Sequence, residues 1–136
     1  MGYFLSLEKY LIIKYDDLII MKNSKFEIYK DKAGEFRFRL KAKNGENILQ
    51  SEGYASKQGC QKAVESVKKN AANEDQFEKR TAKNGQHYFV LKAGNGEVIG
   101  MSEMYKSTSG RDNGIGAVGR AVADSVTDDL TSNPTE

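Results

Sequence analysis

The clearest pattern along the chain is a strict alternation of apolar and polar side chains in short segments. Residues 36–41 read FRFRLK, which places three apolar side chains on one face of an extended strand and three basic ones on the other. Residues 26–29 alternate in the same way, and a third strand is expected over residues 48–51. Asn44-Gly45 lies between the last two segments and predicts a two-residue hairpin turn in which both residues adopt positive φ.

Residues 57–71 carry apolar side chains at the spacing of an amphipathic helix instead. These side chains recur three, four and seven positions apart, so they form one stripe along a helix. Ser56 precedes the segment, and its hydroxyl can accept a hydrogen bond from an unpaired N–H of the first turn. The pattern therefore predicts a β-β-β-α unit of about 50 residues. The stripe consists of Cys60, Ala63, Val64, Val67 and Ala71.

The same pattern occurs a second time, 51 residues further on. Without any gap, residues 26–71 align with residues 77–122, and 18 of the 46 aligned pairs are identical. Ser107 takes the place of Ser56 as a helix cap, and Asn95-Gly96 repeats the hairpin signal. An ungapped match of this length indicates an internal duplication. The second helix is expected to bury Ile115, Val118 and Val122.

One such unit has too little core to be stable alone, because three strands and one helix bury little surface. We therefore expect an α+β fold in which two tandem β-β-β-α(-β) repeats share one antiparallel sheet, with both helices on one face. The repeats span residues 25–75 and 76–125, and the link at residues 73–81 is expected to carry a strand. Residues 1–24 form an N-terminal extension, and residues 126–136, which contain three acidic and no basic groups, are expected to be a disordered acidic tail.

The segments FEIYKDKAGEFRFRLKAKNGE and SEGYASKQGCQKAVESVKKNA, with their second copy from Phe77, resemble the YegP-like family of small bacterial and archaeal proteins. The resemblance covers about 100 of the 136 residues. It implies a β-β-β-α-β unit in which the strand after each helix is exchanged between units, within one chain for tandem repeats and between two chains for single ones. It implies no catalytic residue and no substrate.

The N-terminal extension has no counterpart in the repeat. Residues 1–20 represent either an over-long translation start or an added element that packs on the sheet, alternatives that the intact mass of the native protein would separate. Charged residues interrupt the apolar stretch, so it is too short to span a membrane and lacks the features of a signal peptide. The cytoplasm is the expected compartment.

Composition removes several kinds of chemistry. One cysteine excludes an intramolecular disulfide and a multi-cysteine metal site, and one histidine argues against a histidine-based triad or a zinc cluster. No cofactor and no metal are therefore expected. Cys60 and His87 fall on apolar stripes, where a buried thiol and a histidine at the edge of the core are the expected roles. A G-x-G-x-x-G match at residues 114–119 lies inside the predicted second helix, which is the wrong context for a dinucleotide site.

The net charge of +2 is small for a nucleic-acid-binding protein. The sheet face that points away from the helices nevertheless combines aromatic and basic side chains, which can stack on bases and contact phosphates. A solvated face, or one that docks the N-terminal segment or a second subunit, is the simpler interpretation. The speculative binding residues on this face are Tyr29, Arg37, Arg39, Lys41, Arg80, Tyr88 and Lys92.

A group of signature residues recurs in both repeats, among them an S-E-x-Y motif. Two glutamates brought together could perform acid–base catalysis, but duplication alone explains why they recur. The sequence thus favours a non-enzymatic interaction or binding module with an unidentified partner and a possible homodimer. Nucleic-acid binding on the open sheet face and a carboxylate-dependent enzyme remain as alternatives. The signature residues are Asn44, Gly45, Glu46, Glu52, Tyr54, Asn95, Gly96, Glu97, Glu103 and Tyr105.

Overall fold

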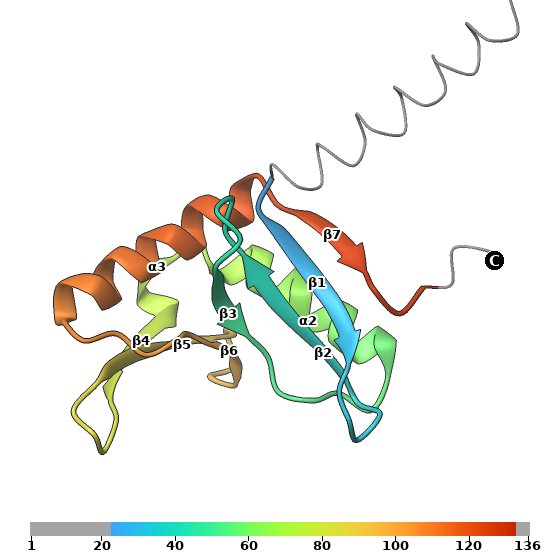
Figure 1. The fold of residues 1–136 in the computed structure, drawn as a ribbon, viewed down its shortest axis with the longest axis horizontal. Helices are drawn as coiled ribbons and strands as arrows, with labels where there is room; N and C mark the ends of the chain where they lie inside the picture. The colour runs from blue at the N-terminus through green and yellow to red at the C-terminus, as the bar shows by residue number, and fades with distance from the viewer. Residues whose placement is uncertain (1–22, 133–136) are drawn as a thin grey trace, which may run out of the picture.

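The computed structural model describes residues 23–132, which form one seven-stranded sheet with two long helices (Figure 1). The expected α+β fold of two tandem repeats is confirmed. The N-terminal segment before residue 23 lies outside the described residues. The first repeat supplies β1 (Lys25–Lys30), β2 (Phe36–Lys41), β3 (Asn47–Gln50) and α2 (Lys57–Asn70). The second supplies the short 3₁₀ helix η1 (Glu74–Gln76), β4 (Phe77–Thr81), β5 (His87–Lys92), β6 (Val98–Met101), α3 (Thr108–Ala123) and β7 (Val126–Asp129).

The strands lie in the order β4-β5-β6-β3-β2-β1-β7, so the two repeats meet at the centre of the sheet. Neighbouring strands from β4 to β1 are antiparallel, whereas β1 and β7 form one parallel pair. The central pairing of β3 with β6 consists of the single residue pair Gln50 and Met101. The register of each repeat shifts at a bulge, between Leu40 and Lys41 and between Leu91 and Lys92.

Strand β7 corrects the prediction of a disordered tail that begins at residue 126. Its four residues pair with β1 of the first repeat, which is the strand exchange that the family resemblance implied. Its acidic side chains are held by lysines from distant segments: Lys57 lies 2.9 Å from Asp129, and Lys25 lies 4.0 Å from Asp128. Backbone pairing and these two contacts keep β7 in place, and none of its side chains is fully buried. Its sequence therefore needs no alternation of apolar and polar residues and shows none.

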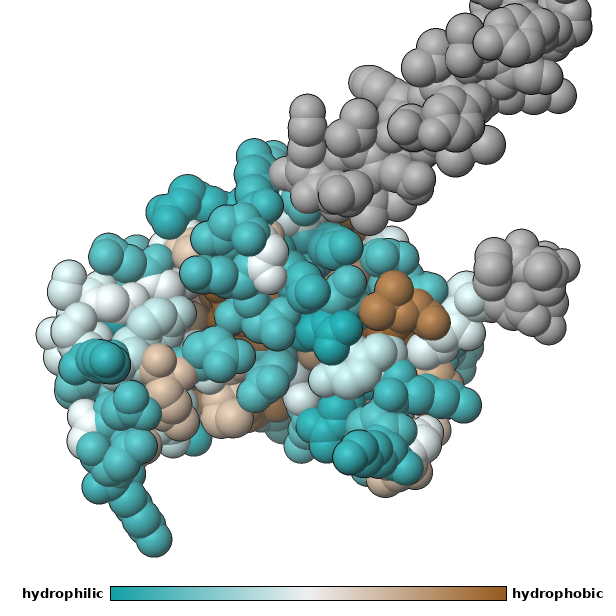
Figure 2. All heavy atoms as spheres, in the orientation of Figure 1, coloured by the Kyte–Doolittle hydropathy of each residue, from teal (hydrophilic) through white to brown (hydrophobic). Residues whose placement is uncertain are grey.

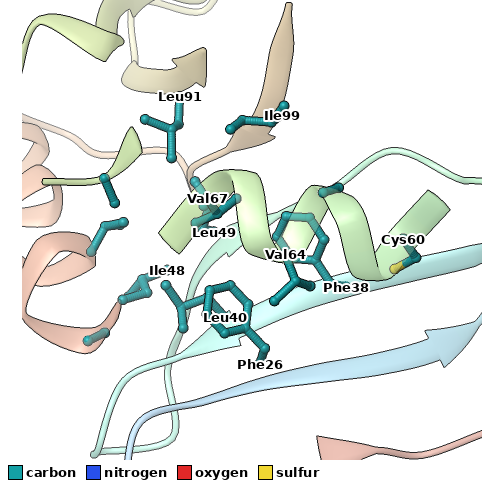
Figure 3. Packing of buried hydrophobic residues seen from close by; sticks show 14 of the residues in the cluster. Phe26, Phe38, Leu40, Ile48, Leu49, Cys60, Val64, Val67, Leu91 and Ile99 are labelled. Atoms are coloured by element: carbon teal, nitrogen blue, oxygen red, sulfur yellow. The ribbon is translucent and has the colours of Figure 1, made fainter. Parts of the chain in front are cut away.

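A single core lies between the sheet and the two helices. Phe26, Ile28, Phe38 and Leu40 from the first repeat are almost completely buried, and all belong to the alternating positions that were predicted to face inward. Figure 3 shows side chains of α2 pointing toward this part of the sheet, with residues of the second repeat at the other end of the cluster. The predicted stripe of the first helix is buried in full, namely Cys60, Ala63, Val64, Val67 and Ala71.

The hairpin turns differ from the expected two-residue type. Gly45 and Gly96 have φ of 86°, but no residue other than glycine has a positive φ within the described part of the chain. The N–H of Gly45 donates to the carbonyl of Ala42, so residues 42–45 form a turn that ends in one left-handed glycine. This is the longer hairpin loop with a glycine bulge, in which the asparagine keeps an ordinary backbone conformation.

Both helices begin as predicted, with Ser56 and Ser107 accepting hydrogen bonds from the N–H groups of Gly59 and Gly110. The glycines of α3 serve close packing at one position, Gly114. A Cβ there would lie 2.6 Å from Cζ of Tyr105 and 3.2 Å from Phe89, whose ring is stacked on that of Tyr105. The Tyr105 ring thus occupies the space that a side chain at position 114 would need. No helix within residues 23–132 has the length and apolar character to cross a membrane.

The two repeats differ at their outer edges, because β7 covers β1 whereas β4 pairs only with β5 within the described chain. Ile28 on β1 is 1% exposed, and its counterpart on β4 is the exposed Lys79. The ammonium group of Lys79 lies 3.2 Å from Asp112 of α3. A lysine on an open edge strand opposes pairing with another chain. The lysine of the second repeat therefore stands on the strand that, within the described residues, has no neighbour corresponding to β7.

We predict that Gly114→Ala destabilises the fold by about 1–3 kcal/mol, the usual cost of overpacking a core. Gly119→Ala is the matched control, because the nearest atom to its Cβ would be the carbonyl oxygen of Ala71 at 3.7 Å, an ordinary contact. We expect this control to stabilise α3 by about 0.5–1 kcal/mol, since alanine loses less backbone freedom than glycine. Urea unfolding followed by circular dichroism measures both, and equal effects would contradict the packing role of Gly114.

We also predict that Lys79→Ile makes the protein associate in a concentration-dependent manner, because it places the apolar residue of β1 on an uncovered edge. Sedimentation velocity over a range of protein concentrations measures the effect. Lys62→Ile, at an exposed position of α2, controls for added surface hydrophobicity. If both variants stay in the same state as the wild type, the lysine does not protect this edge.

Candidate binding face

The sheet face away from the helices, called the outer face below, carries all seven predicted binding residues. In Figure 2 the face toward the viewer is mainly hydrophilic and is interrupted by a few tan to brown patches. Strand alternation places Lys25, Glu27 and Tyr29 of β1 on this face, opposite Lys41, Arg39 and Arg37 of β2. On β4 and β5 it places Glu78 opposite Val90 and Arg80 opposite Tyr88, with Lys92 two residues beyond Val90.

Glu27 is the electrostatic centre of the first repeat's part of the outer face. It is only 5% exposed, and three cations surround its carboxylate. The Nε of Arg39 lies 2.7 Å away, the Nζ of Lys41 3.3 Å and the Nζ of Lys25 3.4 Å. The Arg39 guanidinium also lies over the ring of Tyr29, 4.4 Å from its centroid, a cation–π contact that fixes its orientation.

The environment of Glu27 shifts its pKa in two opposing directions. Burial disfavours the charged carboxylate and raises the pKa, whereas hydrogen bonds and Coulomb attraction from Arg39 and Lys41 lower it. The attraction wins, so the pKa lies below the usual glutamate value. The group is therefore a carboxylate at neutral pH and keeps its ion pairs with the three cations there.

The second repeat has a smaller and more exposed version of this cluster. Glu78 accepts a hydrogen bond of 2.6 Å from the Nε of Arg80 and lies 3.1 Å from the Nζ of Lys92. The hydrogen bond from Arg80 is the main reason that the pKa of Glu78 is lowered. The side chains of Glu78 and Arg80 are 43% and 40% exposed, so water screens this pair and its contribution to stability is small.

A groove of about 280 Å³ lies between the two clusters, where β3 meets β6. We call it the seam groove, because the repeats join here through one residue pair only. Its walls include Val98 and Met101, which are 41% and 38% exposed. Arg37 stands at its edge, with its Nε 2.7 Å from Asp31. The lining residues are Arg37, Gln50, Ser51, Glu52, Val98, Ile99, Gly100 and Met101.

The residues of the S-E-x-Y motif have structural contacts. The hydroxyl of Ser51 accepts a 2.9 Å hydrogen bond from the N–H of Phe38 and donates to the carbonyl of Glu52, and Ser102 makes the same contacts with Phe89 and Glu103. These hydroxyls satisfy backbone groups where the sheet pairing ends.

The two glutamates of the motif are not brought together. Because β3 and β6 are antiparallel through Gln50 and Met101, Glu52 and Glu103 lie on opposite sides of that pair, roughly 13 Å apart along the strands. Both are exposed, and the seam groove includes only Glu52. The arrangement therefore does not bring these two carboxylates together for acid–base chemistry.

Cys60 and His87 occupy the expected places. Cys60 is fully buried, and burial raises the pKa of its thiol to about 11, so the thiol is protonated and unreactive. His87 is half-buried at the start of β5, where its Nδ1 lies 3.5 Å from the hydroxyl of Thr81. Within residues 23–132, no three histidine, cysteine or acidic side chains are grouped as metal ligands.

A larger hollow of about 580 Å³ lies away from the predicted binding residues, between the end of α3 and the β2–β3 hairpin. Four of its nine lining residues are alanines and three are charged, and of the signature residues only Asn44 borders it. Sequence reasoning missed this hollow, the burial of Glu27 and the seam groove. A comparison of the repeats offered one signal for the groove, because Val98 and Met101 replace the polar Asn47 and Gln50 of the first copy.

Comparisons with known proteins identify the family of this chain and other proteins with the same fold. A family model described as "Domain of unknown function (DUF1508)" matches residues 31–78 and 82–129. The chain is 56% identical to the UPF0339 protein in the ptx operon 5' region of Stutzerimonas stutzeri, over 68% of this chain and 84% of that protein. It is 48% identical to the UPF0339 protein YegP of Escherichia coli over the same shares.

Two solution NMR structures have the same fold. The UPF0339 protein of Shewanella oneidensis superposes with a TM-score of 0.75 at 44% identity, covering 79% of this chain and 92% of that one. The protein of unknown function YegP from E. coli superposes with a TM-score of 0.77 at 42% identity, covering 84% and 99%. These likenesses confirm the family resemblance seen in the repeat motifs.

We predict that Glu27→Gln destabilises the protein by about 1.5–3 kcal/mol at pH 7, since it removes charge-assisted hydrogen bonds and leaves three cations without their carboxylate. Because the folded pKa of Glu27 is lowered, its contribution is complete above the ordinary glutamate value of about 4.3 and is lost as the pH falls toward the folded pKa. The difference between wild type and variant in urea unfolding is therefore largest near pH 7 and decreases below about pH 4.

Glu78→Gln is the matched control for this prediction, because it is the exposed counterpart of Glu27 in the second repeat. We expect it to change the free energy of unfolding much less than Glu27→Gln does, because water screens the exposed pair. Equal effects of the two variants, or a Glu27→Gln effect that does not depend on pH, would show that Glu27 is not the centre of the outer face.

Proposed function

Because the chain belongs to this family of domains of unknown function (DUF1508, UPF0339), we propose its function from its geometry: it is a non-enzymatic binding module that contacts a partner protein through the outer face. The observation that supports the proposal is the combination of fixed charged clusters and an exposed apolar strip on one surface. Interfaces of this kind use an apolar centre with a charged surround.

The charged clusters are ordered before any partner arrives. Arg39 is held by Glu27 on one side and Tyr29 on the other, and Arg37 is held by Asp31. Side chains already fixed in one conformation lose little entropy on binding. Such a face suits a partner of complementary shape and charge better than a flexible surface would.

Protein binding is favoured over nucleic-acid binding by the state of these cations. Arg37, Arg39, Lys41, Arg80 and Lys92 each lie within 3.3 Å of a carboxylate oxygen of Asp31, Glu27 or Glu78. A phosphate would have to compete with those carboxylates, which weakens the counterion-release term that dominates nucleic-acid affinity. We keep the cytoplasm, expected from the sequence, as the compartment in which this binding takes place.

The test compares the wild-type chain with an outer-face variant, Arg37→Gln with Arg80→Gln, as immobilised baits in an E. coli lysate treated with nuclease. A control variant, Lys62→Gln with Lys69→Gln, removes the same charge from the exposed face of α2. We expect at least one protein that the wild type and the control retain and the outer-face variant loses about tenfold. Quantitative mass spectrometry measures the recovery, and circular dichroism confirms that all three chains are folded.

If no retained protein depends on the outer face, the proposal is wrong. A gel-shift series with single-stranded RNA and DNA at low and raised salt covers the nucleic-acid alternative. Strong binding there that decreases steeply with salt, and that the outer-face variant loses, would replace the protein partner with a nucleic acid.

A further inference from the structure

The hollow between the end of α3 and the β2–β3 hairpin lies where the chain enters β1. Ser24, the residue before β1, is fully buried and borders this hollow. Its hydroxyl donates a 2.5 Å hydrogen bond to the carbonyl of Ala121 on α3, and its carbonyl accepts one from the N–H of Val126. Figure 1 shows the start of β1 beside the end of α3 and the start of β7. These contacts fix the point at which the preceding residues reach the hollow.

In the second repeat, polar side chains link the helix to the sheet at the equivalent place. The side-chain amides of Asn70, at the end of α2, and Gln76, just before β4, lie 3.5 Å apart. The amide of Gln76 also donates a 2.9 Å hydrogen bond to the carbonyl of Lys92 on β5. The residues that lead into β4 therefore fill the space between the helix and the strand there.

The corresponding positions of the first repeat do not form this link. At the repeat offset of 51 residues, Asn70 corresponds to Ala121, which lines the hollow and has only a methyl group. Gln76 corresponds to Lys25, whose Nζ lies 3.4 Å from Glu27 on the outer face instead. The duplication thus leaves a space open beside β1 that polar side chains fill beside β4.

The residues that lead into Ser24 are apolar. Residues 1–22 lie outside the described part of the chain, and residues 18–21 read LIIM. Residue 21 is three positions from Ser24, a distance that spans at most about 11 Å, so this stretch begins within reach of the hollow. The volume of about 580 Å³ is comparable to that of ligand pockets, about 300–1,000 Å³. It therefore has room for more than one apolar side chain.

The connection of the chain, rather than charge, indicates which molecule fills the hollow. Its charged residues are two cations and one acid, and Lys43 lies 3.4 Å from Asp124, so the rim has little excess of either sign. A segment joined to its site by a short linker has an effective concentration on the order of mM. Residues 18–21 therefore occupy the hollow ahead of a free partner with the same intrinsic affinity.

We propose that the hollow is the docking site for residues 18–21 of the same chain, which fold back from Ser24 and place their apolar side chains against Ala117 and Ala121 of α3. Removing these side chains from water favours the contact. The segment before β1 then does for the first repeat what Asn70 and Gln76 do for the second. This inference is independent of the proposed function, because the hollow lies away from the predicted binding residues.

The test uses the full chain, labelled at the methyl groups of alanine, isoleucine and methionine and studied by NMR. We expect nuclear Overhauser contacts from the methyl groups of Ile19, Ile20 or Met21 to those of Ala117 or Ala121. A second sample mixes two differently labelled preparations of the chain in equal amounts. Contacts that appear only between the two labels would show that a second copy supplies the segment, and would overturn the proposal.

The segment supplies its own matched variants. Ile19→Ser with Ile20→Ser removes two of the docking side chains without changing any residue of the described fold. Ile12→Ser with Ile13→Ser makes the same change earlier in the segment. We expect the contacts between Met21 and the alanines of the hollow to be lost in the first variant and kept in the second.

A change in the hollow tests the same contact from the other side. Ala117→Ser with Ala121→Asn installs the residues that α2 carries at these positions, and we expect the contacts of residues 18–21 with Ala42 on the hairpin to be lost. Circular dichroism confirms that this variant is folded; if it is not, the isoleucine variants decide alone. The inference is wrong if no methyl group of residues 18–21 contacts an alanine of the hollow, or if the contacts persist in the Ile19→Ser, Ile20→Ser variant or in the folded α3 variant.

Discussion

Neither repeat encloses a core of its own, because each has three short strands and a single helix to cover them. The apolar sides of both half-sheets meet α2 and α3 in one continuous cluster, and the half-sheets join through the single pair of Gln50 and Met101. The shared core therefore holds the two half-sheets together, because backbone pairing between them is limited to one residue pair. Apolar burial, which is nondirectional, tolerates such a loose central pairing, and the seam groove on the outer face is its consequence.

Sharing a core also places different demands on two copies of the same sequence. β1 is covered by β7, so its inward residues are fully buried, whereas β4 pairs only with β5 within residues 23–132 and carries Lys79 where β1 has Ile28. Cys60, buried in α2, is likewise replaced by Arg111, which binds Asp112. On α3, Gly114 replaces Ala63 to make room for Tyr105 stacked on Phe89. Divergence between the repeats thus follows the difference in cover at the outer strands and the packing of Tyr105 at Gly114.

The outer face is the surface that the helices leave uncovered, and its charges are organised around two carboxylates. Glu27 gathers three cations in a largely buried cluster, whereas Glu78 holds two in a more exposed one. Both clusters keep the cations in place and reduce their availability to phosphates. Between them, the apolar wall of β6 has no counterpart in the first repeat. The proposed contact with a partner protein rests on these features.

The sequence by itself determined the duplication, the order of strands and helices within each repeat, the two serine caps and the residues of the first repeat that face the core. On the second helix it was right for Val118, whereas Ile115 and Val122, also expected to be buried, are only partly buried. Each of these depends on neighbours within a few positions or on a simple period, which the printed chain contains. Only the tertiary structure decided that β7 pairs with β1, that the hairpin asparagines keep negative φ, that Glu27 is buried among three cations and that Glu52 and Glu103 stay apart. It also decided that Val98 and Met101 border a groove. Apart from the local turn conformation of the asparagines, those features depend on contacts between residues far apart in the chain, and their geometry is set by how two half-sheets share one core.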